Sequence, residues 1–140
     1  MTTQYWLVKQ EPESYAWTQF VADGKTEWTG VRNFQARNNL QGMKKGDQVL
    51  FYASGGPKEV VGTAEVSKAA FPDSTAEENP NPWVAVELKA KDAFARAVTL
   101  TEIKSTPALK DIPLIRHTRL SVMPVSRKEF ETIVKLGEKA

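Results

Sequence analysis

Trp28-Thr-Gly-Val-Arg-Asn-Phe-Gln-Ala-Arg-Asn-Asn-Leu40 places an aromatic ring, a glycine, a guanidinium group and the start of a predicted helix next to one another. Asn33 is a favoured helix N-cap, and apolar residues recur behind it at the spacing of one helix face. An indole can stack on a flat aromatic ligand, and an anion can bind where Arg32 meets the free amides of a helix N-terminus. A second interpretation stays open: Trp28 belongs to the core and Arg32 is an ordinary surface charge.

Apolar segments on both sides of this stretch predict β-strands. Residues 5–9 are rich in aromatic and branched side chains and end in Lys9. Residues 48–54 are apolar on both faces, as in a central or barrel strand, and Tyr52 and Ser54 share one face. This pair is typical of a pocket mouth, although a buried, hydrogen-bonded tyrosine is the alternative for Tyr52. Further strands are predicted at residues 59–66, 83–89 and 95–98.

Helical spacing and capping residues predict helices at four places. The first helix ends at Asp23-Gly24, and the second begins at Asn33. The two later helices start at pairs with capping-box spacing, Thr99 with Glu102 and Ser126 with Glu129. Residues 25–29 are interpreted as a connection, and residues 71–82, rich in Pro, Asn and acidic side chains, as the longest loop.

The chain has 140 residues and no cysteine. This length is typical of one domain and is sufficient for a substantial core, so we expect a single domain over residues 1–140. The lack of cysteine excludes a disulfide framework and thiolate metal sites. Because the sequence shows neither a signal-peptide pattern nor an apolar run that could cross a bilayer, it predicts a soluble intracellular protein, cytoplasmic or, in a eukaryote, nuclear.

The net charge is +2, which is too small to mark the whole surface as attractive to phosphate. The charges are nevertheless unevenly placed along the chain. Residues 31–60 carry five basic and two acidic side chains, and residues 96–140 carry nine and five. If these two segments share one face of the fold, that face attracts phosphate. A well-mixed surface is the alternative.

Recognisable catalytic and metal-binding motifs are missing from the sequence. His117 is the only histidine, so a His-rich metal site cannot form, and no Gly-x-Ser-x-Gly elbow accompanies it. The loop at Gly55-Gly56 lacks the Gly-Lys-Ser/Thr ending of a Walker motif. We therefore expect no catalytic residue, no metal and no cofactor. The chemistry that is left is binding chemistry, from aromatic rings, cations, hydroxyls and amides.

Six segments stand in a characteristic order along almost the whole chain. They are Tyr5-Trp-Leu-Val-Lys-Gln-Glu-Pro12, the stretch from Trp28 to Leu40, Met43-Lys-Lys-Gly-Asp47, Phe51-Tyr-Ala-Ser54, Val61-Gly62 and Arg119-Leu-Ser-Val-Met-Pro124. This set resembles the EVE domain family. The resemblance implies an α+β fold of the PUA-like type, a small mixed β-barrel flanked by short helices. It also implies a pocket that reads modified bases in DNA or RNA.

The resemblance carries a set of candidate base-binding residues onto this sequence, namely Lys9, Trp28, Gly30, Val31, Arg32, Asn33, Tyr52, Ser54, Arg119 and Ser121. In the inferred roles, the rings of Trp28 and Tyr52 contact a flipped base. The hydroxyl and amide side chains read the polar edge of the base, and the cations meet phosphate or carbonyl oxygens. Two positions depart from the family pattern: Ala53 replaces a histidine, and His117-Thr118 replaces an Arg-Ser pair.

The predicted function is a noncatalytic module, expected to be a monomer, that binds DNA or RNA at a methylated or hydroxymethylated base flipped out of its strand. Two alternatives stay open: a small nucleic-acid-processing enzyme such as a nuclease, and an adaptor that binds another protein. The site prediction requires four distant segments to meet in space, at Lys9, residues 28–33, residues 52–54 and residues 119–121.

Overall fold

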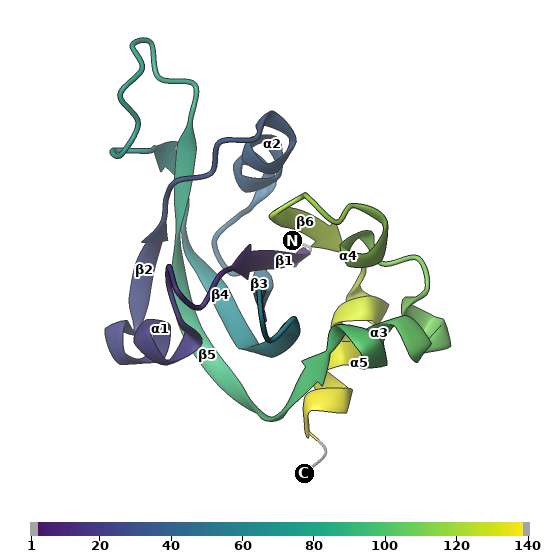
Figure 1. The fold of residues 1–140 in the computed structure, drawn as a ribbon. Coiled ribbons are helices and arrows are strands. Elements are labelled where there is room, and N and C mark those ends of the chain that lie inside the picture. Colours follow the sequence, from purple (N-terminus) through teal and green to yellow (C-terminus); the bar gives the residue numbers. More distant parts are fainter. Residues whose placement is uncertain (1–2, 139–140) are drawn as a thin grey trace.

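Six strands form one sheet in residues 3–138, the part of the chain that this computed structural model describes (Figure 1). The strands are β1 (Tyr5–Gln10), β2 (Lys25–Trp28), β3 (Gln48–Ala53), β4 (Glu59–Pro72), β5 (Val84–Thr99) and β6 (Val122–Val125). Their order across the sheet is β2-β5-β4-β3-β1-β6. The neighbouring strands β1 and β3 are parallel, and the other neighbouring pairs are antiparallel.

This arrangement confirms the α+β class and the mixed sheet with short helices. It does not close into the barrel that was expected, because within residues 3–138 no ladder joins the edge strands β2 and β6. The sheet instead bends strongly through its two longest strands, β4 and β5 (Figure 1). Several register shifts interrupt their pairing, and such bulges increase the local twist of a sheet and bend it.

Short helices flank the sheet, and the ones that follow Asn33, Thr99 and Ser126 begin at the predicted caps. They are α1 (Trp17–Asp23), α2 (Phe34–Gly42), α3 (Leu100–Ser105), the 3₁₀ turn η1 (Pro107–Leu109), α4 (Pro113–Arg116) and α5 (Arg127–Glu138). The side chain of Asn33 accepts a hydrogen bond from the Ala36 amide at 2.9 Å, as predicted for α2. At α5, Ser126 and Glu129 bond each other's amides at 3.0 and 2.8 Å, which confirms the capping box.

Two segments differ from the sequence-based expectation because tertiary pairing overrides local pattern. Residues 25–29 were expected to be a connection, but residues 25–28 form strand β2 against residues 86–89 of β5. The separate strands expected at residues 83–89 and 95–98 are parts of the single strand β5. Its middle contains polar residues and alanines without alternation, so its strand conformation depends on pairing with β4.

The sheet buries apolar side chains on both faces. On one face, Phe51 of β3 packs against Trp28, with ring centroids 5.7 Å apart. On the other face, Tyr5 of β1 contacts Phe130 of α5, with ring centroids 4.9 Å apart. Because side chains alternate along a strand, Tyr52 points away from Phe51. Trp28 and Tyr52 therefore lie on opposite faces of the sheet.

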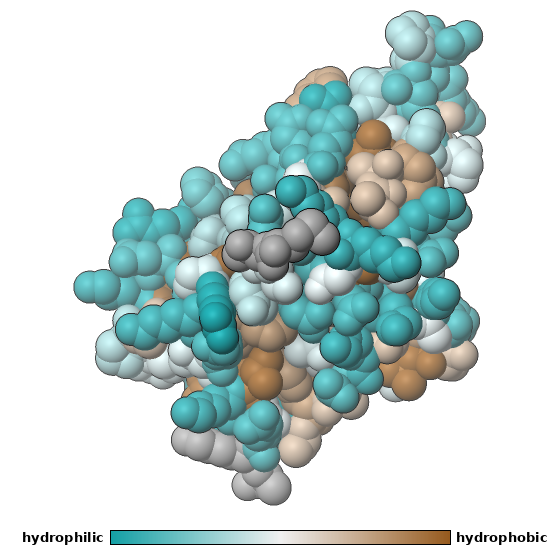
Figure 2. All heavy atoms as spheres, turned by 180° about the vertical axis from the view of Figure 1, so that it is seen from behind, coloured by the Kyte–Doolittle hydropathy of each residue, from teal (hydrophilic) through white to brown (hydrophobic). Residues whose placement is uncertain are grey.

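The surface is mostly hydrophilic, with small separate apolar patches in the view from behind (Figure 2). Among the described residues, Val21 and Phe34 are the large apolar side chains with substantial exposure, at 50% and 56%. None of the helices in residues 3–138 combines the length and apolar character that a membrane span requires.

Candidate functional site

Three segments that are distant in the sequence meet at one end of the central strands. β1 and β3 are parallel, so their C-terminal ends lie together, and β6 is antiparallel to β1, so its N-terminal end joins them. Two backbone hydrogen bonds hold this junction. The Ser54 amide donates to the Gln10 oxygen at 3.0 Å, and the Lys9 amide donates to the Ser121 oxygen at 2.9 Å. The structure thus brings three of the four predicted segments together.

A cavity of about 370 Å³ opens at this junction. We call it the lysine cavity because Lys9, Lys58 and Lys104 all line it. Tyr52 and Ser54, which the sequence predicted as partners of Lys9, line the same cavity. Tyr52 is buried, Lys9 and Ser54 are half-buried, and the other two lysines are exposed. The cavity therefore has a phenol at its buried end and ammonium groups toward solvent.

Lys9 and Tyr52 lie close together in the lysine cavity, and burial shifts the pKa of both. The Lys9 Nζ donates to the Thr118 oxygen at 2.9 Å and lies 5.9 Å from the centroid of the Tyr52 ring. Burial lowers the pKa of Lys9 and raises the pKa of Tyr52, because removal from water disfavours the charged form of each group. At neutral pH Tyr52 is consequently an uncharged phenol that can bond a ligand.

A second, shallower space lies on the other side of Thr118, and we call it the arginine hollow. Its volume is about 250 Å³, and Asn33, Gln35 and Arg119 line it. Helix α2 is held beside β6 by Asn39, whose Nδ2 donates to the Val122 oxygen at 2.6 Å. Since the N-cap bond uses the side-chain oxygen of Asn33, the amide NH₂ of that residue is the group it can offer to a ligand.

Arg32 and Gly30 face a different structure, the loop after β4. Arg32 Nη1 lies 3.0 Å from Asp73 Oδ2, and the Gly30 amide donates to the same oxygen at 2.8 Å. Gly30 has a φ of 82°, which a glycine adopts without a steric penalty. Burial by itself raises the pKa of Asp73, but hydrogen bonds from Thr75, Gly30 and Arg32 outweigh it and hold the pKa at about 2. These contacts tie the loop to the segment before α2.

Trp28 is a core residue in this structure, with 4% of its surface exposed. Tyr15, Phe20 and Phe51 surround its ring, with centroids 6.4, 6.4 and 5.7 Å away. Tyr15 covers it in an edge-on arrangement and is itself held by a 2.7 Å hydrogen bond to Asp23. Val31 is also buried in the core, at 8% exposure. The Trp28 ring is therefore not accessible to a ligand in this structure.

The predicted residues therefore divide into groups. Lining residues of the lysine cavity include Lys9, Tyr52 and Ser54, and those of the arginine hollow include Asn33 and Arg119. Ser121 contacts this region through its backbone oxygen, which accepts a hydrogen bond from the Lys9 amide. The other four residues line neither space. Trp28 and Val31 lie in the core, and Gly30 and Arg32 bond Asp73 in the loop after β4. Sequence reasoning missed the cavity residues Lys58, Lys104 and Thr118. An isolated lysine after a turn or late in a helix carries no local signal, whereas Thr118 lay in a recognisably polar segment.

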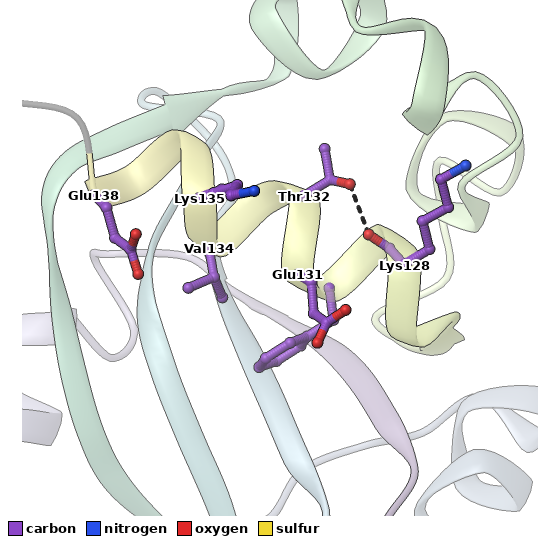
Figure 3. A pocket seen from close by; sticks show the side chains of 7 residues that line it. Lys128, Glu131, Thr132, Val134, Lys135 and Glu138 are labelled. Atoms are coloured by element: carbon purple, nitrogen blue, oxygen red, sulfur yellow. Dashed lines mark hydrogen bonds between the residues drawn. The ribbon is translucent and has the colours of Figure 1, made fainter.

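A separate hollow of about 520 Å³ follows helix α5 and contains none of the predicted residues (Figure 3). Two lysines and two glutamates, Lys128, Glu131, Lys135 and Glu138, line it along the helix. The Thr132 hydroxyl is already bonded to the Lys128 oxygen at 2.7 Å. Because the charges of this hollow balance and it contains none of the predicted residues, we place the candidate site at the lysine cavity and the arginine hollow.

The bent mixed sheet, its flanking helices and the hollows at the ends of β1 and β3 define an α+β domain of the PUA-like type. The chain belongs to the EVE domain family, whose model matches residues 4–136. This match confirms the family that the six sequence segments indicated.

Similar proteins cover nearly the full chain. Thymocyte nuclear protein 1 of Homo sapiens is 32% identical in an alignment that covers 98% of this chain and 75% of that protein. The crystal structure of protein Atu2648 from Agrobacterium tumefaciens is 39% identical, with a TM-score of 0.93 over 99% of this chain and 97% of that one. The structure of human THYN1 protein in complex with 5-methylcytosine-containing DNA is 30% identical, with a TM-score of 0.89 over 99% of both chains.

Proposed function

We propose that the protein is a noncatalytic module that binds a modified base, methylated or hydroxymethylated, in DNA or RNA. One observation carries the proposal: a domain of the same family, similar over 99% of this chain, has been crystallised with DNA that contains 5-methylcytosine. The two hollows beside Thr118 supply suitable chemistry, since hydroxyl and amide groups lie next to exposed cations.

In this proposal a flipped base enters the lysine cavity. The Tyr52 ring and Leu114 contact the base, and the half-buried Ser54 and Lys9 bond its polar edge. On the other side of Thr118, Arg119 meets the phosphate backbone of the strand. Base reading and backbone binding then fall to different residues, which makes them separable by mutation.

The test is a titration of labelled DNA and RNA strands that contain cytosine, 5-methylcytosine or 5-hydroxymethylcytosine at one position. We expect one modified strand to bind more tightly than its unmodified counterpart. Arg119→Gln is expected to weaken all strands by a similar factor, and Arg127→Gln, an exposed arginine on α5, serves as the control. Equal affinity for every modified and unmodified strand would rule out base recognition.

A nucleic-acid-processing enzyme is the second candidate, favoured by one observation. Lys9 is half-buried in the lysine cavity and burial lowers its pKa, a shift in the direction that favours a lysine as proton acceptor. Incubation with modified and unmodified strands, followed by separation of the products, tests this activity. Cleavage or base conversion that is lost in Lys9→Ala would replace the noncatalytic proposal.

A further inference from the structure

We propose that the outer part of the lysine cavity is a phosphate-binding subsite formed by Lys58 and Lys104, which lie nearer to solvent than Lys9. This inference rests on the proposed function and deepens it, because it assigns a phosphate contact on the side of Thr118 opposite to Arg119. A nucleic-acid strand bound at the site would thus be held on both sides of the flipped base.

The three lysines come from separate elements, and the fold holds them around one space. Lys9 lies next to the last residue of β1, Lys58 precedes β4, and Lys104 lies on α3. The Leu100 amide donates to the Lys58 oxygen at 2.9 Å, which fixes the start of α3 against the loop before β4. Leu100 and Lys104 are one turn apart on α3, so both face the cavity that they line.

The backbone at Lys58 supports a positioned side chain. Its φ is 51°, in the left-handed region, where residues other than glycine pay roughly 1–2 kcal/mol. A glycine would remove this cost, and two glycines stand just before it at positions 55 and 56. A lysine in a strained backbone conformation points to a role for its side chain.

The charges around the lysine cavity are unbalanced. Among the described residues, three ammonium groups line it and no carboxylate does. Within residues 3–138, none of the three lysines forms an ion pair. Glu11 lies near the edge of the cavity, beside the lining residue Gly55. Its Cγ is 4.0 Å from the position that a Cβ on Gly55 would occupy. Like charges gathered around a partly desolvated space repel one another, and an anion relieves that repulsion.

The lining groups lie at different depths, which gives the base and the phosphate different parts of the cavity. Tyr52 is buried and Lys9 is half-buried, whereas Lys58 and Lys104 are exposed. A base therefore fits the inner part next to Tyr52, and its phosphate fits the outer part between the exposed lysines. Ammonium groups are suited to this position because they bind phosphate as point charges with freely rotating donors.

The experiment measures affinity for a strand carrying the preferred modified base as a function of NaCl concentration, in Lys58→Gln, Lys104→Gln and the double variant. Each single variant is expected to reduce the slope of log affinity against log salt by about 1. Affinity falls by the same factor for modified and unmodified strands. The control is Lys44→Gln with Lys45→Gln, two exposed lysines before β3, at the opposite end of that strand from Ser54.

A second arm identifies the source of the phosphate. The free 5′-monophosphate of the preferred modified nucleoside and inorganic phosphate are titrated into the wild type and the double variant. Binding of either that is lost in the double variant supports a subsite for free phosphates. Loss of strand binding alone supports the backbone phosphate as the ligand.

The two proposals fail in different ways. If the double variant has the same salt slope and affinity as the wild type and still prefers the modified base, the phosphate subsite is overturned. The proposed function then stays in place. Reduced slopes without any preference for a modified base would support the subsite and overturn base recognition.

Discussion

At the scale of single residues, the site depends on which side chains have free polar groups. Tyr52 and Ser54 reach the lysine cavity, whereas Trp28 is enclosed by other aromatic rings on the opposite face of the sheet. Arg32 is likewise committed, since its guanidinium bonds Asp73 and Thr75. The first set lines a cavity, which is why the proposed function uses it, and the second lies in and around the segment that leads into α2.

Replacement of Ser54 tests base reading by one hydroxyl. Ser54→Ala removes a hydrogen bond to the base, so we expect a loss of about 1 kcal/mol, roughly a fivefold drop in affinity for the preferred modified strand. The measurement is the same titration of labelled strands. Ser67→Ala is the matched control, because Ser67 bonds Glu87 on β4 and β5 and lines neither hollow. Unchanged affinity in Ser54→Ala would remove Ser54 from the interface.

Asp73 is predicted to stabilise the fold in a pH-dependent manner. Its pKa of about 2 in the folded protein lies below the ordinary value of 3.8, so its contribution is fully present above about pH 4 and is lost as the pH falls toward 2. Asp73→Asn should lower the free energy of unfolding by about 1–3 kcal/mol at neutral pH. The amide has no charge and only one oxygen, so the donors of either Gly30 and Arg32 or Thr75 lose their acceptor.

Urea unfolding of wild type and Asp73→Asn between pH 2 and pH 7 measures this effect. The difference between the two proteins should shrink as the pH approaches 2. A constant difference over the whole range would mean that the carboxylate charge is not responsible. Asp111→Asn is the control, because its ion pair with Arg116 is 62% exposed on both sides.

At the scale of elements, the N-terminus of α2 links fold and site. Asn33 caps the helix with its oxygen and lines the arginine hollow, while Asn39 holds the same helix to β6. Helix α2 therefore sets the distance between the hollow and the strand ends. The aromatic and cationic residues around position 33 serve both purposes.

Two substitutions at Asn33 separate capping from binding. Asn33→Asp keeps the capping oxygen and suits the helix dipole, so stability should be retained, but it removes the NH₂ group and repels phosphate. Asn33→Ala should lower the free energy of unfolding by about 1 kcal/mol. Unfolding and strand-binding measurements on both variants make the comparison. If Asn33→Asp binds strands as the wild type does, Asn33 acts only as a cap.

At the scale of the whole molecule, the bent sheet brings the ends of β1, β3 and β6 together with α3. Residues 31–60 and 96–140, the two basic segments, both contribute to the hollows beside Thr118. The bend depends on close packing where β4 meets β5. At Gly62, an added Cβ would overlap the Trp17 ring and the Asp92 carbonyl oxygen.

Gly62→Ala is accordingly expected to destabilise the protein by about 1–3 kcal/mol, because the overlapping groups must shift in a packed interior. Thermal or urea unfolding measures the loss. Gly56→Ala is the matched control, since a Cβ there meets no atom within 4 Å. Equal stability of the two variants would show that β4 and β5 can separate without cost at this bulge.

Local chemistry allowed the sequence by itself to predict strands β1, β3 and β4 and the capped helices, whereas the α+β class was implied by the family resemblance. An N-cap such as Asn33 and a capping box such as Ser126 with Glu129 act over three residues, so their effect is visible in the sequence. The family resemblance added the candidate site residues. Strand β2 and the continuous strand β5 were missed because they depend on pairing between distant segments.

Only the tertiary structure decided which candidates share a space. Parallel pairing of β1 with β3 places Lys9 beside Tyr52. Because side chains alternate along β3, Phe51, which packs against Trp28, points to the face opposite to Tyr52. The packing of α3 against the loop before β4 added Lys58 and Lys104 to the cavity. Such convergence depends on contacts between residues far apart in the chain, which no local sequence pattern encodes.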